Sequence, residues 1–359
     1  MSQRAHMVVL VFGAFFLLAF GSCTNRSVDE RRLSSTTVGF DDAFQVLNDV
    51  VLEQSEKDSI ADVGAFSELP DGSLIVADRL LPRIRHYTND GRFLAASGSF
   101  GSGPYEFRGI NGVAPTGKDE LAVVDVKEGR LVILRKNLTQ DTMYHLPLPP
   151  SGPIAPLEND LIMGLWGGRT GLRFYRVAGD SVVWGIFAPP PEVLAKPYWG
   201  STSLDMFTVA GNRVFAANSL LYPIHVFNAR GEEIGQIGSP PPSFHKVPEV
   251  PAGYFAGPAS GEKLKHWTAQ FTVMGRLATI ESRFLVVSHA RLSSEPRTFL
   301  RPEEYAVDLY DLTDGHKVFE DIPLPSGSRV LGGGRFLYVL VSQAPDPWRI
   351  MEVRPKVKN

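Results

Sequence analysis

Residues 119–136 read DELAVVDVKEGRLVILRK. The first half is a run of apolar residues that ends at Asp125, and the short turn Lys127-Glu128-Gly129 leads into a second apolar run. Short runs rich in Val and Ile that are separated by turn residues are typical of adjacent antiparallel strands. This stretch therefore predicts a β-hairpin.

The same unit recurs along the chain. Its six versions share an apolar strand that follows a turn, and they are SLIVADR (73–79), ELAVVDV (120–126), DLIMGLW (160–166), RVFAANS (213–219), RFLVVSH (283–289) and RFLYVLV (335–341). A second strand follows each of them: RIRHYT, RLVILRK, RFYRVAG, PIHVFNA, YAVDLYD and WRIMEVR, respectively. Matching positions lie 40 to 70 residues apart, and a four-stranded propeller blade takes about 40 to 50 residues. The longest interval indicates an insertion.

Connectors rich in Pro and Gly separate these units. There are five: GSGPYEF (101–107), LPLPPSG (146–152), APPPE (188–192), GSPPPS (238–243) and IPLPSG (322–327). Because proline cannot donate to a sheet ladder, such segments end one sheet and let the chain cross to the next. We therefore predict an all-β fold, a six-bladed β-propeller of four-stranded antiparallel blades. The alternative is a two-sheet sandwich or two separate β domains.

The last unit lacks an outer strand, because the chain ends in RPKVKN soon after WRIMEV (348–353). The segment AFQVLNDVVLE (43–53) is apolar enough to supply that strand from the N-terminal side. We expect this pairing to close the propeller, since radial closure protects the edges of the sheets.

Residues 96–134 resemble an NHL-type repeat, in which a glycine-rich connector ending in Glu-Phe precedes a turn, a strand ending in Val-Asp and a strand ending in an aliphatic pair. The positions that match are Phe107, Gly112, Val113, Asp125, Val132 and Ile133. Tyr105 replaces the usual glycine, and residues 70–93 form a second copy in which Asp78 matches Asp125. Later copies match only in the spacing of their strands and turns. Asp78 and Asp125 are expected to cap backbone N–H groups in turns.

The N-terminus resembles the lipobox of bacterial lipoproteins. Arg4 precedes the apolar run Met7–Phe20, and Gly21 and Ser22 lead into Cys23, the single cysteine of the chain. A run of this length fits a signal peptide better than a membrane-spanning helix. The resemblance implies cleavage before Cys23 and lipidation of Cys23, although Phe20 stands where an aliphatic residue is usual. The alternative is a secretory cut after Gly21.

These features divide the chain into a signal peptide (1–22), a polar tether (23–40) and a propeller (41–359) with an insertion at 239–277. Together they resemble the bacterial six-bladed β-propeller lipoproteins with NHL-type repeats. That resemblance implies a cell-envelope protein anchored to the membrane by lipid. Thr24 lacks the aspartate associated with inner-membrane retention, so we expect the outer membrane, facing the periplasm or the surface.

Composition agrees with a folded envelope protein. The chain has 359 residues, 43% of them hydrophobic, with a net charge of −3 and no block of like charge. Nothing in this balance favours nucleic acid as a partner. With Cys23 lipidated, no cysteine is left for a disulfide.

The insertion is the main candidate for function, because loops longer than about 12 to 15 residues are often functional. It is rich in Pro, Gly and aromatic residues, of which Phe244, Tyr254, Phe255 and Trp267 could form a binding surface. They could equally form a hydrophobic plug over the propeller face. Trp166 and Trp199 present the same two alternatives.

Two functions fit this scaffold. The first is a binding or scaffold module that recognises an envelope protein, peptide or glycan. For this module we expect no cofactor, no metal and no enzymatic activity. The alternative is a metal-dependent hydrolase resembling propeller lactonases and esterases, with a divalent cation such as calcium at the axis. Its ligands could be drawn from Glu68, Asn111, Asn218 and Asp308, since hard cations prefer oxygen. The eight histidines show no zinc-site spacing, and no nucleophile elbow or phosphate loop is present.

Overall fold

The computed structural model describes residues 38–55, 58–117, 119–166, 172–176, 182–187, 205–251, 253–254, 260–291, 304–341 and 347–357. All of them belong to one compact unit, Thr37–Asn359. Within these ranges no helix has the length and apolar character needed to cross a membrane. The predicted signal peptide and most of the tether lie outside them.

The described residues form six four-stranded antiparallel sheets. The first three, in chain order, are β2–β5, β8–β11 and β12–β15. Their strands are β2 (Val63–Glu68), β3 (Leu74–Asp78), β4 (Arg83–Tyr87), β5 (Phe93–Ser97), β8 (Ile110–Pro115), β9 (Glu120–Asp125), β10 (Arg130–Arg135), β11 (Gln140–His145), β12 (Pro150–Leu157), β13 (Asp160–Trp166), β14 (Leu172–Arg176) and β15 (Val182–Phe187).

The fourth and fifth sheets are β16–β19 and β20–β23, and the last sheet has the order β1-β26-β25-β24. Their strands are β16 (Asp205–Ala210), β17 (Arg213–Asn218), β18 (Leu221–Asn228), β19 (Glu233–Ile237), β20 (Thr272–Ile280), β21 (Phe284–Arg291), β22 (Ala306–Asp311), β23 (Lys317–Pro323), β24 (Arg329–Gly332), β25 (Leu337–Leu340), β26 (Arg349–Pro355) and β1 (Phe44–Val51). The remaining elements are the helices α1 (Phe40–Ala43) and α4 (Ser260–Thr268) and the two-stranded parallel sheet of β6 (Ser99–Phe100) and β7 (Glu106–Phe107).

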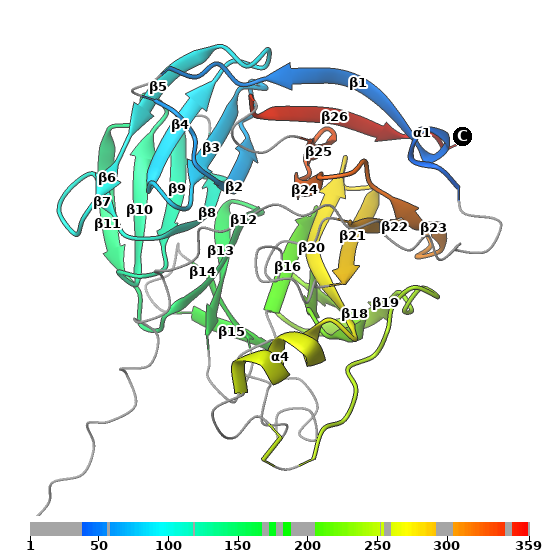
Figure 1. Ribbon diagram of the computed structural model, residues 1–359. Coiled ribbons are helices and arrows are strands. Elements are labelled where there is room, and N and C mark those ends of the chain that lie inside the picture. Colours follow the sequence, from blue (N-terminus) through cyan, green and yellow to red (C-terminus); the bar gives the residue numbers. More distant parts are fainter. Residues whose placement is uncertain are drawn as a thin grey trace, which may run out of the picture. The chain divides into compact units, whose positions relative to one another are not determined.

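The sheets are arranged around a common centre (Figure 1). The first strands of successive sheets contact one another in the cyclic order β2, β8, β12, β16, β20 and β24, and β24 contacts β2 again. Six buried apolar clusters fill the spaces between neighbouring sheets. One of them joins the last sheet to the first, with Trp348 and Tyr338 packed against Phe66 and Leu74. A two-sheet sandwich is therefore wrong for this chain.

The predicted closure by the N-terminal segment is confirmed. Strand β1 pairs antiparallel with β26 along its length, from Phe44 opposite Pro355 to Val51 opposite Arg349. The amide of Leu52 then donates to the carbonyl of Trp348 at 2.9 Å. The outermost strand of the last sheet therefore comes from the opposite end of the described chain.

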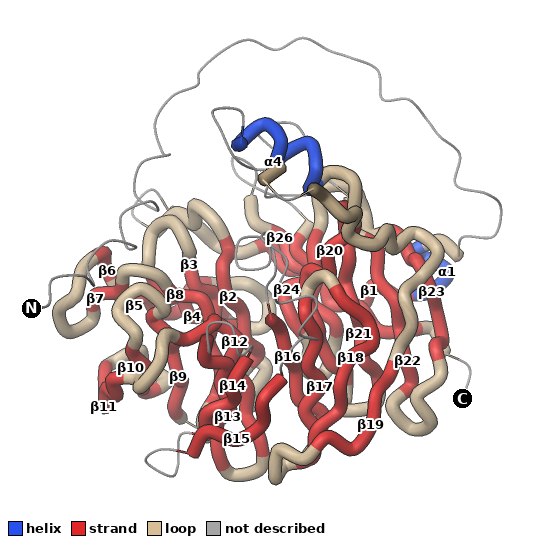
Figure 2. The backbone as a smooth tube through the Cα atoms, turned by 90° about the horizontal axis from the view of Figure 1, so that it is seen from below, coloured by secondary structure: helices blue, strands red, loops and turns tan. Residues whose placement is uncertain are grey.

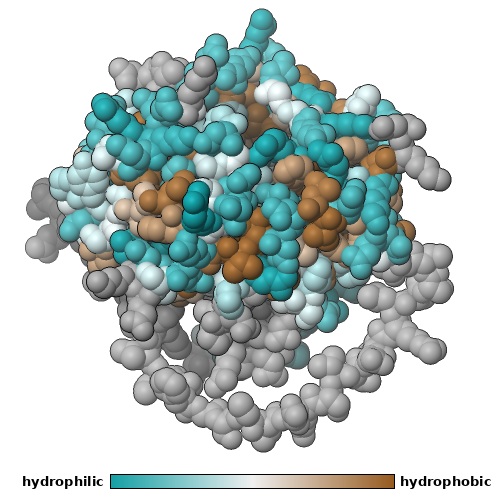
Figure 3. Space-filling model, turned by 90° about the horizontal axis from the view of Figure 1, so that it is seen from above, coloured by the Kyte–Doolittle hydropathy of each residue, from teal (hydrophilic) through white to brown (hydrophobic). Residues whose placement is uncertain are grey.

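Strand β1 is an exposed edge, and its sequence limits further pairing. Five consecutive residues, 45–49, are exposed, and among them Asp49 forms an ion pair with Arg349 of β26. Charged residues on an edge strand discourage association with other sheets. The side of the molecule on which β1 lies in Figure 1 is mostly hydrophilic, with separate apolar patches (Figure 3).

Several predicted boundaries shift. The connector at 146–152 ends inside β12, which begins at Pro150, and the connector at 322–327 begins inside β23. Residues 272–277 of the predicted insertion belong to β20, so the segment between β19 and β20 is 238–271. It contains α4, a helix that the sequence pattern did not predict. The insertion lies between the fourth and fifth sheets in chain order, as expected.

Candidate functional site

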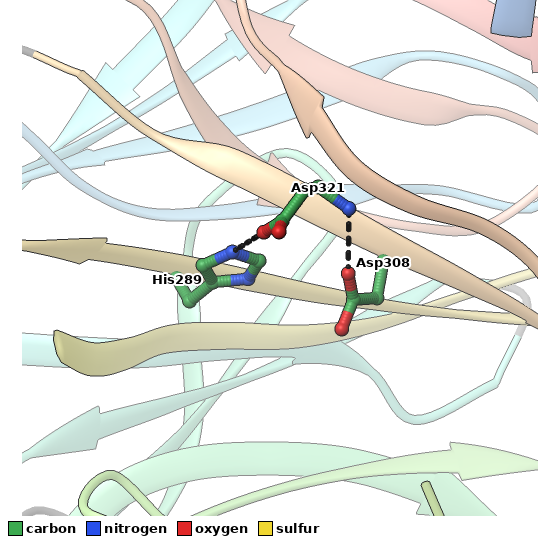
Figure 4. Close-up of side chains that lie close together, drawn as sticks. All are labelled: His289, Asp308 and Asp321. Atoms are coloured by element: carbon green, nitrogen blue, oxygen red, sulfur yellow. Dashed lines mark hydrogen bonds and ion pairs between the residues drawn. The ribbon is translucent and has the colours of Figure 1, made fainter. Parts of the chain in front are cut away.

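A buried polar cluster lies between the fifth sheet and the start of the insertion. His289 belongs to β21, Asp308 to β22 and Asp321 to β23. One nitrogen of His289 and one carboxylate oxygen from each aspartate lie within 4.8 Å of one another (Figure 4). His289 is 2% exposed and Asp308 is fully buried. Among the residues that the structure describes, this is the single group of three His, Cys, Asp or Glu side chains close enough to share a metal ion.

A bulge in β23 brings Asp321 into this cluster. The register between β22 and β23 shifts on both sides of Leu309, and Asp321 has a φ of 53°. Its amide donates to Oδ1 of Asp308 at 2.9 Å. Because a bulge bends its strand and redirects a side chain, the carboxylate of Asp321 faces His289 (Figure 4).

Ser243 joins the cluster from the insertion. Its hydroxyl and its amide both donate to the carboxylate of Asp321, the amide at 3.1 Å. Nε2 of His289 lies 2.9 Å from Oδ1 of Asp321 and 3.3 Å from the hydroxyl of Ser243. In a Ser-His-Asp triad, the acid and the serine use different ring nitrogens. Here both use Nε2, so the cluster does not have the geometry of a hydrolase triad.

The second ring nitrogen of His289 is buried and has no hydrogen-bond partner among the described residues. Figure 4 shows it on the edge of the ring that faces Asp308. A buried nitrogen without a partner costs about 1 to 3 kcal/mol. This atom is the one part of the cluster that internal hydrogen bonds do not account for.

The two aspartates differ in their electrostatics. Burial raises the pKa of Asp308, although His289 and Lys317 act in the opposite direction. Burial also disfavours the charge of Asp321, but hydrogen bonds from His289 and Ser243 outweigh it and lower the pKa of Asp321. The hydroxyl of Tyr222 donates to Oδ2 of Asp308 at 3.3 Å, and Nζ of Lys317 lies 3.8 Å from that oxygen. Asp308 is therefore the less well compensated of the two acids.

The aromatic residues of the insertion pack inward where the structure describes them. Trp267 is 1% exposed and lies edge-on to Phe271 at 4.7 Å, and its indole N–H donates to the carbonyl of Pro248 at 3.2 Å. Phe244 is 8% exposed and packs against Tyr222 with the core between the fourth and fifth sheets. Phe244 and Trp267 are therefore packed inside the protein and offer little surface to a partner.

Tyr254 remains partly exposed. Its ring packs beside the small apolar cluster of Leu220, Trp267 and Phe271, and the ammonium of Lys263 lies 5.5 Å from its centre. Of the predicted aromatic set, Tyr254 is thus the described member that a partner could reach. Phe255 lies outside the described residues, as do Trp199, the side chain of Trp166 and the predicted lipidation site Cys23.

Three of the four residues proposed for an axial cation have hydrogen-bond partners in the structure. Glu68 accepts hydrogen bonds from the amide and guanidinium of Arg335. Asn218 accepts from the amide of Leu220 at 3.0 Å. Asn111 is exposed, and Asp308 belongs to the cluster with His289. Glu68 and Asp308, the two carboxylates of this set, do not share one group.

Asp78 and Asp125 cap backbone groups, as predicted. Asp78 accepts from the amides of Leu80 and Leu81 in the following turn, and from Ala61 and Asp62. Asp125 accepts from residues 108 and 109 before β8 rather than from its own turn. Both carboxylates also lie near a buried arginine, so they hold neighbouring loops together.

The other strand histidines have ordinary surroundings. Nε2 of His86 lies 2.8 Å from the hydroxyl of Ser73, and burial lowers the pKa of His86. Nδ1 of His225 lies 2.9 Å from Glu233 in a more exposed setting. For each of these rings the structure gives a hydrogen-bonding side chain on a neighbouring strand or turn. His289 faces several, and the linear sequence gave no sign of that difference.

Comparisons with known proteins identify the fold. No protein-family model matches the chain, and no curated protein matches it in sequence. A solved structure from Bacteroides vulgatus ATCC 8482, a member of the DUF4221 family, superposes with a TM-score of 0.66 at 11% identity and covers 88% of this chain and 99% of that one. This superposition agrees with the circular arrangement of four-stranded sheets described above. The chain is a β-propeller with four-stranded antiparallel blades.

A second structure shows the same propeller architecture. It is a protein of Bacteroides fragilis NCTC 9343 whose name describes it as exported, with a TM-score of 0.60 and 14% identity. The superposition covers 90% of this chain and 98% of that one. At these identities the similarity defines the fold and leaves function to the residues of the site.

Proposed function

We propose that this protein is a cell-envelope lipoprotein that acts as a binding or scaffold module through one face of a six-bladed β-propeller. The six sheets and the six apolar clusters between them support this blade count. The N-terminal resemblance to a lipobox and the exported neighbour from Bacteroides fragilis support the location. The expected partner is an envelope protein, peptide or glycan.

The observation that carries a binding role is the insertion at one end of the propeller, in its described residues 238–251, 253–254 and 260–271. The described residues between β19 and β20 belong to no sheet, yet several of them form an apolar cluster around Trp267. Figure 2 shows α4 beyond one end of the strands. A long loop with an internal core can present side chains in a fixed geometry, and such loops are often functional. Tyr254 and Lys263 are the described groups on which we expect a partner to bind.

A site-specific photocrosslinker at Tyr254 tests this role in intact cells. We expect one reproducible crosslinked envelope component at this position, because an aromatic beside a cation suits a peptide or glycan surface. The matched position is Tyr144 on β11, which is 43% exposed and lies outside the insertion. An excess of purified wild-type protein should compete for the component, and a Tyr254→Ala variant should compete less well.

Equal crosslinking at both positions would contradict a binding face on the insertion. Chelator-sensitive hydrolysis of a lactone or ester panel by the purified protein would instead favour the enzymatic alternative. In that case a variant of Glu68 that keeps the fold but abolishes turnover would identify an axial site.

Lipidation of Cys23 is tested by metabolic labelling with a fatty acid. We expect the wild type to be labelled and the Cys23→Ser variant to be unlabelled, because the chain has no other cysteine. Cell fractionation should then place the wild type with membranes and release the variant. Label that persists in Cys23→Ser would disprove the lipid anchor.

A further inference from the structure

We propose that His289, Asp308 and Asp321 form a binding site for a transition-metal dication of the Zn²⁺ type, which fastens the insertion to the fifth sheet. The three residues come from the adjacent strands β21, β22 and β23. Their ligand atoms lie within 4.8 Å of one another. The site is distinct from the axis of the propeller and goes beyond the binding role proposed above.

The donor set selects the metal. An imidazole with two carboxylates suits Zn²⁺ and its neighbours in the transition series, whereas Ca²⁺ and Mg²⁺ prefer oxygen alone. In a tetrahedral zinc site, ligand atoms at about 2.0 to 2.2 Å from the metal are roughly 3.3 Å apart. The three side chains would therefore need only small rotations. The hydroxyl of Ser243, which already contacts His289 and Asp321, lies beside the position of a fourth ligand.

An independent observation points to a ligand at this place. Nδ1 of His289 is buried without a hydrogen-bond partner and lies on the side of Asp308. A ligating histidine uses one nitrogen for the metal and the other for a carboxylate or carbonyl that fixes the ring. Here Nε2 lies 2.9 Å from Oδ1 of Asp321, near the spacing of two ligands of one metal ion. Nε2 is thus the nitrogen that would bind the metal beside Asp321 and Ser243. Nδ1, which faces Asp308 (Figure 4), would then carry the proton and donate it to that carboxylate, so metal binding would satisfy the unpartnered nitrogen.

The charges around the cluster also accommodate a dication. Asp308 and Asp321 bring two negative charges into a buried space, and the cation that faces them is Lys317, 3.8 Å from Asp308. The ammonium of Lys317 has closer partners, namely Glu320 at 2.5 Å and the carbonyl of Ser239 at 3.2 Å. Buried charges require a partner or a metal. A dication would compensate both carboxylates without displacing Lys317 from Glu320.

Metal binding would also order the beginning of the insertion. The amide and hydroxyl of Ser243 both bond to Asp321, and the amide of His245 donates to the hydroxyl of Thr272 at 3.0 Å. These contacts attach residues 243–245 to the fifth sheet. A metal that fixes Asp321 would hold Ser243 in place through the same carboxylate. We therefore expect Zn²⁺ to raise the melting temperature, since a ligand that binds only the folded state stabilises it.

The test is calorimetric titration of the full chain with ZnCl₂, without an affinity tag and in a Cys23→Ser background, so that neither a tag nor a thiol binds zinc. We expect one equivalent to bind, and binding to weaken roughly tenfold or more in His289→Ala and in Asp308→Asn. The matched control is His225→Ala, which removes a histidine that pairs with Glu233 outside the cluster, and it should bind zinc as the background does. Titration with Co²⁺ should give visible absorption bands that His289→Ala lacks.

Absence of stoichiometric Zn²⁺ and Co²⁺ binding to the background protein would overturn the proposal and leave a purely hydrogen-bonded structural cluster. So would zinc binding by His289→Ala that equals that of the background. If circular dichroism shows that His289→Ala does not fold, the same comparison is made with Asp321→Asn. The measurement on the background protein decides the question whatever the variants do. None of these outcomes depends on the partner of the insertion.

Discussion

Deletion of residues 24–53 is expected to unfold the protein, whereas deletion of residues 24–38 is expected to leave its thermal transition unchanged. The longer deletion removes β1, the outer strand of the last sheet. It also removes Phe44, Val50 and Leu52, which are at most 2% exposed. Burying three such side chains contributes roughly 5 to 9 kcal/mol, and a domain of this kind has a total stability of about 5 to 15 kcal/mol. Circular dichroism melts of the two deletions measure the difference.

A point substitution tests the same closure without removing a strand. Gly91 has a φ of +87°, and a Cβ atom added there would lie 2.2 Å from the carbonyl oxygen of Val51 at the end of β1. Gly91→Ala should therefore cost at least about 2 kcal/mol, from the backbone conformation and from the displaced strand. Gly211→Ala is the matched control, because Gly211 has a φ of +60° and open space around it. Equal losses in the two variants, or a folded 24–53 deletion, would show that β1 does not close the propeller.

Trp267→Ala is expected to lower the free energy of unfolding by about 3 to 5 kcal/mol, the usual cost of truncating a buried aromatic side chain. Trp267 is 1% exposed and forms the centre of the apolar cluster under the insertion, with Phe271 and Leu220. Since Leu220 lies between β17 and β18, the cluster joins the insertion to the fourth sheet. Urea unfolding measures the loss, and limited proteolysis within residues 238–271 reports whether the insertion opens.

Tyr254→Ala is the control for this variant. Its ring is partly exposed and packs at the margin of the same cluster, so we expect a loss of about 1 kcal/mol, mostly from the contact with Lys263. A Trp267→Ala protein with wild-type stability and wild-type resistance to protease would contradict the packed insertion. The two variants thus separate the structural part of the insertion from the part available to a partner.

The strands and their order could be predicted from the sequence because their signals are local. An apolar run and the turn beside it occupy fewer than ten residues, as in ELAVVDV and RLVILRK, which are β9 and β10 in the structure. Capping by Asp78 was predictable for the same reason, since the amides of Leu80 and Leu81 lie two and three residues away. Closure by residues 43–53 followed from counting strands. The helix α4 was missed because a nine-residue helix in a Pro- and Gly-rich insertion leaves little periodic signal.

The candidate metal site depends on distances that only the tertiary structure sets. His289, Asp308 and Asp321 lie on three strands, and Asp321 reaches the others through a bulge whose position no turn residue marks. Ser243 arrives from the insertion and contacts a residue 78 positions away. The burial of Phe244 and Trp267 depends likewise on how the insertion packs on the fourth and fifth sheets. The sequence alone determined which segments become strands, because backbone propensity and turn chemistry act between near neighbours. The packing of one sheet against the next decided which polar side chains share a buried space, because that depends on contacts between residues far apart in the chain.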